Sequence, residues 1–131
     1  MTQTSSPKKE VMVTMDTVAR ESAIPFLRGI RGEYAGYEIP VLPTGILLGR
    51  SATACNLVFR QTTEVSRYHC RVAYDRRTGY FIVTDLRSQN GIYTENGQRL
   101  ASGEKLVLAP GQSFMMCGSG TAFQTFVKLK T

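Results

Sequence analysis

Three short polar clusters, each next to an apolar run, carry the side chains of this sequence that are best suited to hold an anion. In chain order they are Gly49-Arg50, then Ser66-Arg67-Tyr68-His69, then residues 85–91, which read DLRSQNG. A guanidinium, a hydroxyl and a carboxamide can together bind an anion and the peptide backbone that carries it. Such a set needs neither a nucleophile nor a metal, so it indicates recognition rather than catalysis.

Short strands must position these clusters. From residue 25 onward, runs rich in Val, Ile, Leu, Phe and Tyr alternate with Gly, Asn, Pro and charged residues. The strands expected from this pattern span residues 24–28, 37–42, 46–49, 56–59, 69–74, 80–85, 92–94, 105–108, 113–117 and 122–129. Turn signals at 75–79 and 95–98 imply antiparallel neighbours. We therefore predict an all-β fold, a β-sandwich of about ten to eleven short, mostly antiparallel strands.

The first 22 residues differ from the rest. Val11, Met15 and Val18 have the spacing of a short amphipathic helix, and an extended tail fits the segment equally well. We predict a tail over residues 1–22, flexible or a short helix, and one domain over residues 23–131.

Composition and cysteine usage limit the cellular setting. No apolar run approaches the ~20 residues of a membrane-spanning helix, and the polar start lacks the apolar stretch of a secretory signal. The three cysteines, Cys55, Cys70 and Cys117, have no CxxC spacing. We expect a cytoplasmic protein with reduced thiols, no metal, no cofactor and no membrane insertion.

The chain is basic, with 16 Lys and Arg against 10 Asp and Glu, a formal charge of +6. This balance favours an acidic partner such as a phosphopeptide, a nucleic acid or an anionic membrane. The cations are scattered, and the interleaved aromatic and basic residues of single-strand binders are missing from the sequence. We expect no nucleic-acid partner, and a monomer.

The order and spacing of the three clusters resemble the forkhead-associated (FHA) domain family, whose members bind phosphothreonine peptides. The family pattern of Gly-Arg, Ser-x-x-His and Asp-Leu-x-Ser-x-Asn-Gly is met at residues 49–50, 66–69 and 85–91. The resemblance covers roughly residues 24–129. It implies a β-sandwich whose loops at one end bind phosphothreonine.

The resemblance also implies a role for each site residue. Arg50 and Ser66 would contact the phosphate, and Arg67 would contact the phosphate or the peptide. Asn90 would pair with the peptide backbone beside the phosphothreonine. Gln89 stands where many such domains have Thr, so its backbone N–H and its side-chain amide are the donors expected there.

Four further residues are expected to support the site without touching the ligand: Gly49, His69, Ser88 and Gly91. An imidazole under the loop can hold Ser66 in place, and the glycines permit backbone geometry that a Cβ would strain. The predicted function is a phosphothreonine-dependent adaptor in Ser/Thr kinase signalling, whose partner is a phosphothreonine protein, such as a Ser/Thr kinase or its substrates.

Three alternatives remain. Ser66, His69 and Asp85 suggest a hydrolase, but the sequence lacks a nucleophile elbow and a second histidine. Threonines in the N-terminal segment, at positions 2, 4, 14 and 17, suggest a switch that inhibits itself when one of them is phosphorylated. The fold could also serve as a protein-interaction domain that ignores phosphorylation.

Overall fold

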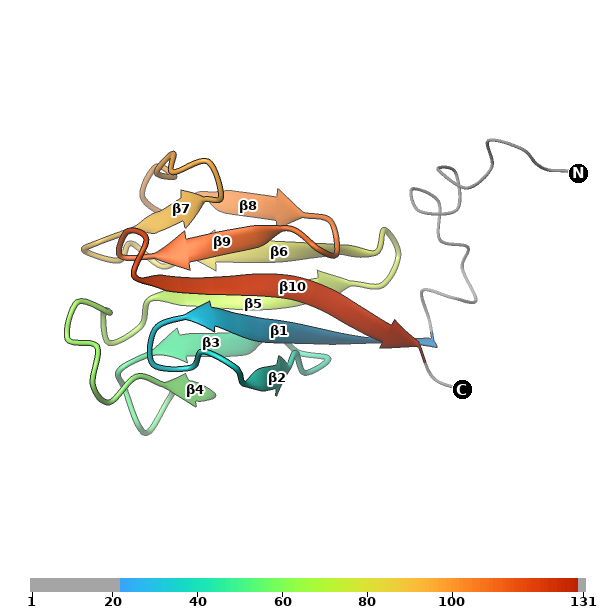
Figure 1. Ribbon diagram of the computed structural model, residues 1–131, viewed down its shortest axis with the longest axis horizontal. Helices are drawn as coiled ribbons and strands as arrows, with labels where there is room; N and C mark the ends of the chain where they lie inside the picture. The colour runs from blue at the N-terminus through green and yellow to red at the C-terminus, as the bar shows by residue number, and fades with distance from the viewer. Residues whose placement is uncertain (1–21, 130–131) are drawn as a thin grey trace, which may run out of the picture.

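The computed structural model describes residues 22–129 as ten strands in two five-stranded sheets (Figure 1). The strands are β1 (Ala23–Arg31), β2 (Glu38–Pro40), β3 (Ile46–Gly49), β4 (Leu57–Val58), β5 (Cys70–Asp75), β6 (Tyr80–Asp85), β7 (Ile92–Thr94), β8 (Lys105–Leu108), β9 (Ser113–Met116) and β10 (Thr121–Leu129). The predicted all-β sandwich is confirmed. The predicted tail over residues 1–22 lies outside the described residues, apart from Ser22.

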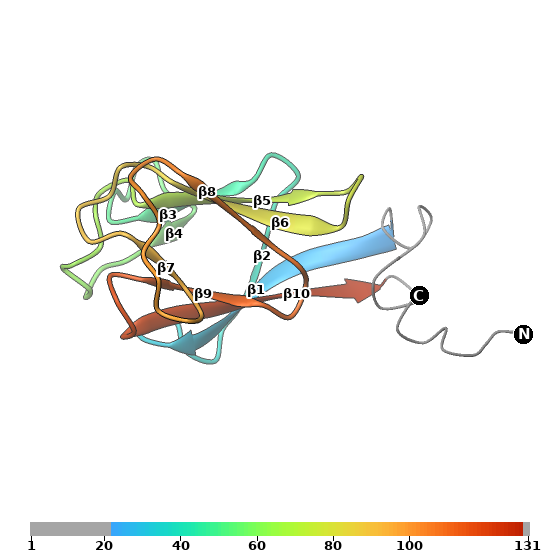
Figure 2. The same cartoon turned by 90° about the horizontal axis from the view of Figure 1, so that it is seen from above.

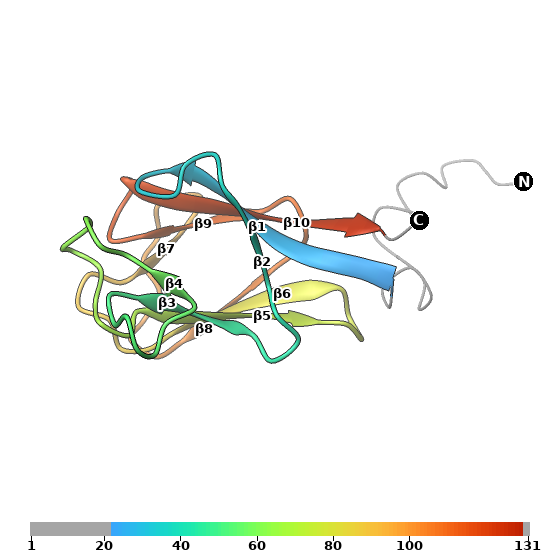
Figure 3. The same ribbon diagram turned by 90° about the horizontal axis from the view of Figure 1, so that it is seen from below.

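The two sheets pack face to face, as the views from above and below show (Figures 2 and 3). One sheet has the order β2-β1-β10-β9-β7 and the other the order β4-β3-β5-β6-β8. Alternation along the strands sends apolar side chains between the sheets. Phe123 of the central strand β10 is fully buried there, with ring centroids 5.7 Å from Phe114 and 6.3 Å from Phe59.

Strand register brings the sequence clusters to one end of the sandwich. Leu48 pairs with Cys70, and Cys70 pairs with Asp85, so β3 ends, β5 begins and β6 ends at the same level. In the other sheet, Met116 pairs with Ile92 and with Thr121. The loops next to these strand ends therefore share the end at the left of Figure 1, whereas Ala23 and the Leu129 with which it pairs lie at the opposite end.

The outer face of the first sheet is covered by charged side chains rather than left apolar. Phe26 stacks on Phe126 at 5.3 Å between centroids, with Arg28 4.4 Å from the Phe126 centroid and Lys128 4.8 Å from that of Phe26. Glu38 forms ion pairs with both cations. This arrangement limits edge and face association of the sheet.

One strand boundary differs from the sequence prediction in a way that affects the site. The strand expected over residues 113–117 ends at Met116, and Cys117 adopts a left-handed backbone with φ of 61°. A β-branched or bulky residue would be strained in this conformation, and even cysteine occupies it rarely.

In the part of the chain that the structure describes, no helix is long and apolar enough to cross a membrane.

Leu48 links the core to the site, because it is fully buried in β3 one residue before Gly49. Replacing Leu48 with Ala should lower the free energy of unfolding by about 2–5 kcal/mol, through lost burial and the cavity left behind. Val107→Ala, at a β8 position that is 57% exposed, should change it by no more than about 0.5 kcal/mol. Urea denaturation followed by circular dichroism measures both, and equal effects would contradict the assignment of Leu48 to the core.

Candidate functional site

The loop after β3 lies unusually close to the loop that carries Ser66. The N–H groups of Arg50 and Ser51 donate to the carbonyls of Ser66 and Arg67, both at 3.1 Å. A Cβ at Gly49 would collide with the Arg67 carbonyl and lie 3.0 Å from the Cys55 sulfur. Glycine at position 49 is therefore what allows the two loops to pair.

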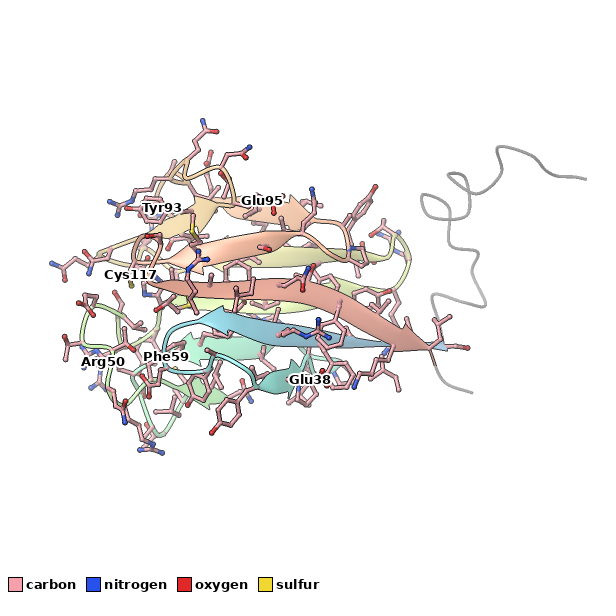
Figure 4. All side chains as sticks on the ribbon, in the orientation of Figure 1. Glu38, Arg50, Phe59, Tyr93, Glu95 and Cys117 are labelled. Atoms are coloured by element: carbon pink, nitrogen blue, oxygen red, sulfur yellow. The ribbon has the colours of Figure 1, made fainter. Side chains whose placement is uncertain are left out.

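Arg50 is exposed, but its position is fixed. Its Nε donates to the carbonyl of Val65 at 2.6 Å, and its terminal guanidinium nitrogens make no hydrogen bond with residues 22–129. Arg50 also lines a pocket of about 300 Å³ together with Phe59, Arg60 and Thr62, among others. Figure 4 shows Arg50 beside Phe59 at the loop end of the sandwich.

The segment between β4 and Ser66 is anchored at both ends and capped from the other sheet. Phe59 and Val65 are each 1% exposed, so the residues between them form a raised loop with buried ends. Glu33, from the β1–β2 connection, accepts three consecutive backbone N–H groups of this loop. The bonds come from Arg60 (2.8 Å), Gln61 (3.1 Å) and Thr62 (3.2 Å), and the Thr62 hydroxyl adds a fourth at 2.8 Å. Burial raises the pKa of Glu33, but these bonds outweigh it and hold the pKa below its usual value.

His69 joins the Ser66 loop to the loop after β6. The side chain is fully buried, its Nδ1 accepts the Ser66 N–H at 3.0 Å, and its Nε2 lies 2.9 Å from the carbonyl of Gly91. Since an N–H faces Nδ1 and a carbonyl faces Nε2, the ring must be neutral with its proton on Nε2. Burial lowers the pKa of His69, and the bond to Gly91 and the charge of Asp85 offset this lowering only in part.

Asp85 and Ser88 shape the turn that ends at Gly91. Asp85 is 3% exposed and accepts the Ser88 hydroxyl at 2.5 Å and the N–H of Gly103 at 2.9 Å, while the Ser88 oxygen accepts the Gly91 N–H at 3.1 Å. Burial raises the pKa of Asp85, but the bonds from Ser88 and Gly103 lower it below its usual value. Gly91 has φ of 82°, which favours glycine.

The two loops meet at Ser66 and Gln89. The N–H of Gln89 donates to the Ser66 hydroxyl oxygen at 3.0 Å, so the hydroxyl proton of Ser66 is left to donate elsewhere. Of the two donors expected at Gln89, the backbone N–H is thus bonded to Ser66. The side-chain amide remains the donor that Gln89 can offer, and Arg99 holds the Gln89 carbonyl at 2.9 Å.

Asn90 and Cys117 share an acceptor that the sequence did not reveal. The Asn90 amide and the Cys117 thiol both donate to the carbonyl of Glu64, at 2.8 and 3.2 Å. The N–H of Cys117 also donates to the Gly91 carbonyl at 3.1 Å. One N–H and the oxygen of the Asn90 side chain make no hydrogen bond with residues 22–129. Cys117 thus connects a third loop to the site, and no sequence motif marks it.

Arg67 is placed differently from the other predicted contact residues. Its side chain is exposed and lies 5.9 Å from the Tyr68 ring centroid, while its carbonyl accepts the Ser51 N–H and the Cys55 thiol. The structure therefore brings Arg50, Ser66, Gln89 and Asn90 together at one end, with Arg67 at the rim. Among residues 22–129, no group of three or more His, Cys, Asp or Glu could hold a metal ion.

A two-sheet sandwich that carries these three polar clusters in loops at one end is typical of FHA domains. The FHA domain family model matches residues 46–117, from β3 to Cys117. The chain belongs to the FHA domain family. The comparison with curated proteins finds no match.

Solved structures share this fold at low sequence identity. The FHA domain of an Arabidopsis thaliana hypothetical protein superposes with a TM-score of 0.70 at 21% identity, covering 84% of this chain and 90% of that one. The FHA domain of CT664 from Chlamydia trachomatis superposes with a TM-score of 0.66 at 18% identity, covering 79% of this chain and 96% of that one. The N-terminal FHA domain of Rad53p from S. cerevisiae, solved in complex with a phosphothreonine peptide, superposes with a TM-score of 0.63 at 15% identity. This match covers 80% of this chain and 94% of that one.

The buried neutral His69 should make stability pH-dependent. Because the folded pKa lies below the unfolded value near 6.5, the unfolded chain binds more protons at mildly acid pH. The stabilisation is complete above about pH 7 and should fall as the pH drops from 6.5 toward the lower folded pKa. His69 is the only histidine of the chain. His69→Gln should remove this slope in urea unfolding measured between pH 5.5 and 7.5, and an unchanged slope would contradict the neutral ring.

The turn after β6 depends on the Ser88 hydroxyl. Ser88→Ala should lower the free energy of unfolding by about 1–3 kcal/mol, because the buried Asp85 carboxylate loses a donor and the Gly91 N–H loses its acceptor. Ser102→Ala, at an exposed loop position, serves as the matched control and should have an effect below about 0.5 kcal/mol. Equal stability of the two variants would show that the hydroxyl does not hold the turn.

Proposed function

We propose that this chain is a phosphothreonine-dependent peptide-binding adaptor in Ser/Thr kinase signalling and has no catalytic activity. Arg50, Ser66 and Gln89 hold the phosphate, Arg67 contacts the phosphate or the peptide, and Asn90 holds the backbone of the extended peptide. The observation that carries the proposal is that the loops of Arg50, Ser66 and Asn90 meet at one end of the sandwich, and that each of these side chains keeps donors with no hydrogen bond to residues 22–129.

The chemistry of phosphothreonine matches these donors. Its phosphate carries about −1.5 to −2 charges at neutral pH and three acceptor oxygens. Arg50 offers a permanent planar cation whose Nε is already held by Val65, so few of its rotamers remain to be ordered on binding. Ser66 offers a hydroxyl whose oxygen is already occupied by the Gln89 N–H. The set is preorganised for an acceptor-rich dianion.

The contacts of Ser66, His69 and Asp85 support binding over hydrolysis. His69 bonds the Ser66 backbone N–H rather than its hydroxyl, and Asp85 bonds Ser88 and Gly103. A hydrolytic triad would need the imidazole on the serine hydroxyl and the carboxylate on the imidazole. All three side chains instead serve the geometry of the loops.

Similar structures agree with the proposed ligand. The Rad53p domain is in complex with a phosphothreonine peptide, and so is the MEK1 FHA domain, with the HOP1 pThr318 peptide. An adaptor that binds phosphorylated substrates transiently is expected to have micromolar affinity, about −7 to −9 kcal/mol. Its partners are proteins that a Ser/Thr kinase has phosphorylated on threonine.

Fluorescence anisotropy with a phosphothreonine peptide library tests the proposal, beside phosphoserine and unphosphorylated versions. Arg50→Ala should weaken phosphothreonine binding about 100-fold or more, because two charge-assisted hydrogen bonds are lost. Arg50→Lys keeps the charge but loses the planar fork, so a loss of about tenfold is expected.

Arg77→Ala is the matched control for this experiment. Arg77 follows β5 in the turn at the far end of the sandwich, and its side chain is 90% exposed. Its removal changes the net charge equally and should leave the affinity within about twofold. Equal binding of phosphorylated and unphosphorylated peptides would overturn the proposal and favour a phosphorylation-independent interaction domain.

A further inference from the structure

A second pocket adjoins the candidate site on the other side of Thr62. Thr62 lines both this pocket and the one beside Arg50, so the raised loop separates them. The second pocket has a volume of about 250 Å³, and Glu64, Met116 and Cys117 contribute to its lining. Figure 4 shows Cys117 at the same end of the sandwich as Arg50.

The lining of this pocket combines a soft apolar part with an acidic rim. Met116 is fully buried, and Cys117 is half-buried. Thioether and thiol groups pack well against a flexible methylene chain. The exposed Glu64 carboxylate makes no hydrogen bond or ion pair with any residue of the described range 22–129. Burial and then the nearby charge of Glu64 raise the pKa of Cys117 to about 11, which agrees with a carboxylate facing the pocket.

The charges around the pocket leave it acidic. Glu64 is the one charged residue among those that line this pocket, and Glu33, which accepts the Thr62 hydroxyl, lines neither pocket. Arg31, next in sequence to the lining residue Gly32, donates to the Ser119 carbonyl at 2.7 Å and lies 3.4 Å from the Met115 sulfur. The first pocket is thus lined by Arg50 and Arg60, and the second by Glu64.

A bound peptide would pass this pocket. Asn90, which the proposed function assigns to the peptide backbone, donates to the carbonyl of Glu64 at 2.8 Å. The group that holds the peptide is therefore attached to the residue that forms the acidic rim. Long basic side chains place an apolar stem against apolar surface and keep the charged head near an acid.

We propose that this pocket binds a lysine or arginine side chain of the same phosphothreonine peptide. The inference rests on the proposed function. A preferred ligand carries its phosphate toward Arg50 and a basic residue, a few positions away, toward Glu64. The stem of that residue lies on the half-buried Cys117, and its charge pairs with the carboxylate.

The test uses the full chain and a phosphothreonine peptide in which each flanking position is set in turn to Lys, norleucine or Glu. At one position, Lys should bind about three- to fivefold tighter than norleucine, with Glu weakest, as for a partly exposed ion pair. The preference should shrink at about 0.5 M NaCl. Anisotropy titrations give the affinities.

Glu64→Gln should remove the Lys preference while binding of the norleucine peptide stays within about twofold. Glu38→Gln makes the same charge change on the outer sheet face, away from Arg50 in Figure 4, and should keep the preference. The inference is overturned if no position favours Lys, or if Glu64→Gln retains the preference. Both outcomes leave phosphothreonine binding intact, whereas failure of every phosphothreonine peptide to bind overturns the proposed function and this inference together.

Discussion

A buried imidazole is what joins two loops that otherwise share few bonds. His69 accepts from the Ser66 N–H and donates to the Gly91 carbonyl, and the same carbonyl accepts the Cys117 N–H. If the ring turned or gained a proton, one buried backbone group would lose its partner, at a cost comparable to that of a lost hydrogen bond. The position of Ser66 relative to Gln89, and hence the direction of the serine hydroxyl, follows from this bridge.

Two carboxylates of this basic protein, those of Glu33 and Asp85, order its loops through hydrogen bonds. Glu33 ties the raised loop to the opposite sheet through backbone N–H groups, and Asp85 fixes the turn after β6 through Ser88 and Gly103. Each carboxylate is satisfied by donors that belong to the loops, so short polar contacts order both loops between their buried residues. Neither carboxylate pairs with Arg50 or Arg67, both of which are exposed, so an anionic ligand can reach these two cations.

Much of the fold could be predicted from the sequence, because periodicity and turn residues report directly on strands. The predicted ranges 46–49, 80–85, 92–94 and 105–108 are those of β3, β6, β7 and β8. One difference lies in the expected strand 37–42, of which only Glu38–Pro40 forms β2; Pro40 ends this strand and has no N–H to donate. Register then carries the three clusters to one end.

The parts of the site that depend on long-range contacts could not be predicted. Glu33 lies far from every motif in the sequence and reaches the site across the two sheets, and an isolated loop glutamate gives no signal of that role. Cys117 acts through a left-handed backbone and a thiol donor, neither of which has a sequence signature. The bond from the Gln89 N–H to the Ser66 hydroxyl could not be predicted either, because it depends on how two loops meet.

The pairing of Ala23 with Leu129 has a consequence for how the domain can be joined to others. The first and last described strands meet at the end of the sandwich opposite Arg50, so the described chain starts and stops side by side. In a sandwich connected in this way, neighbouring segments attach at one end, while the loops that carry Arg50 and Ser66 project from the other. The same fold can then be inserted into different chains without covering its loops.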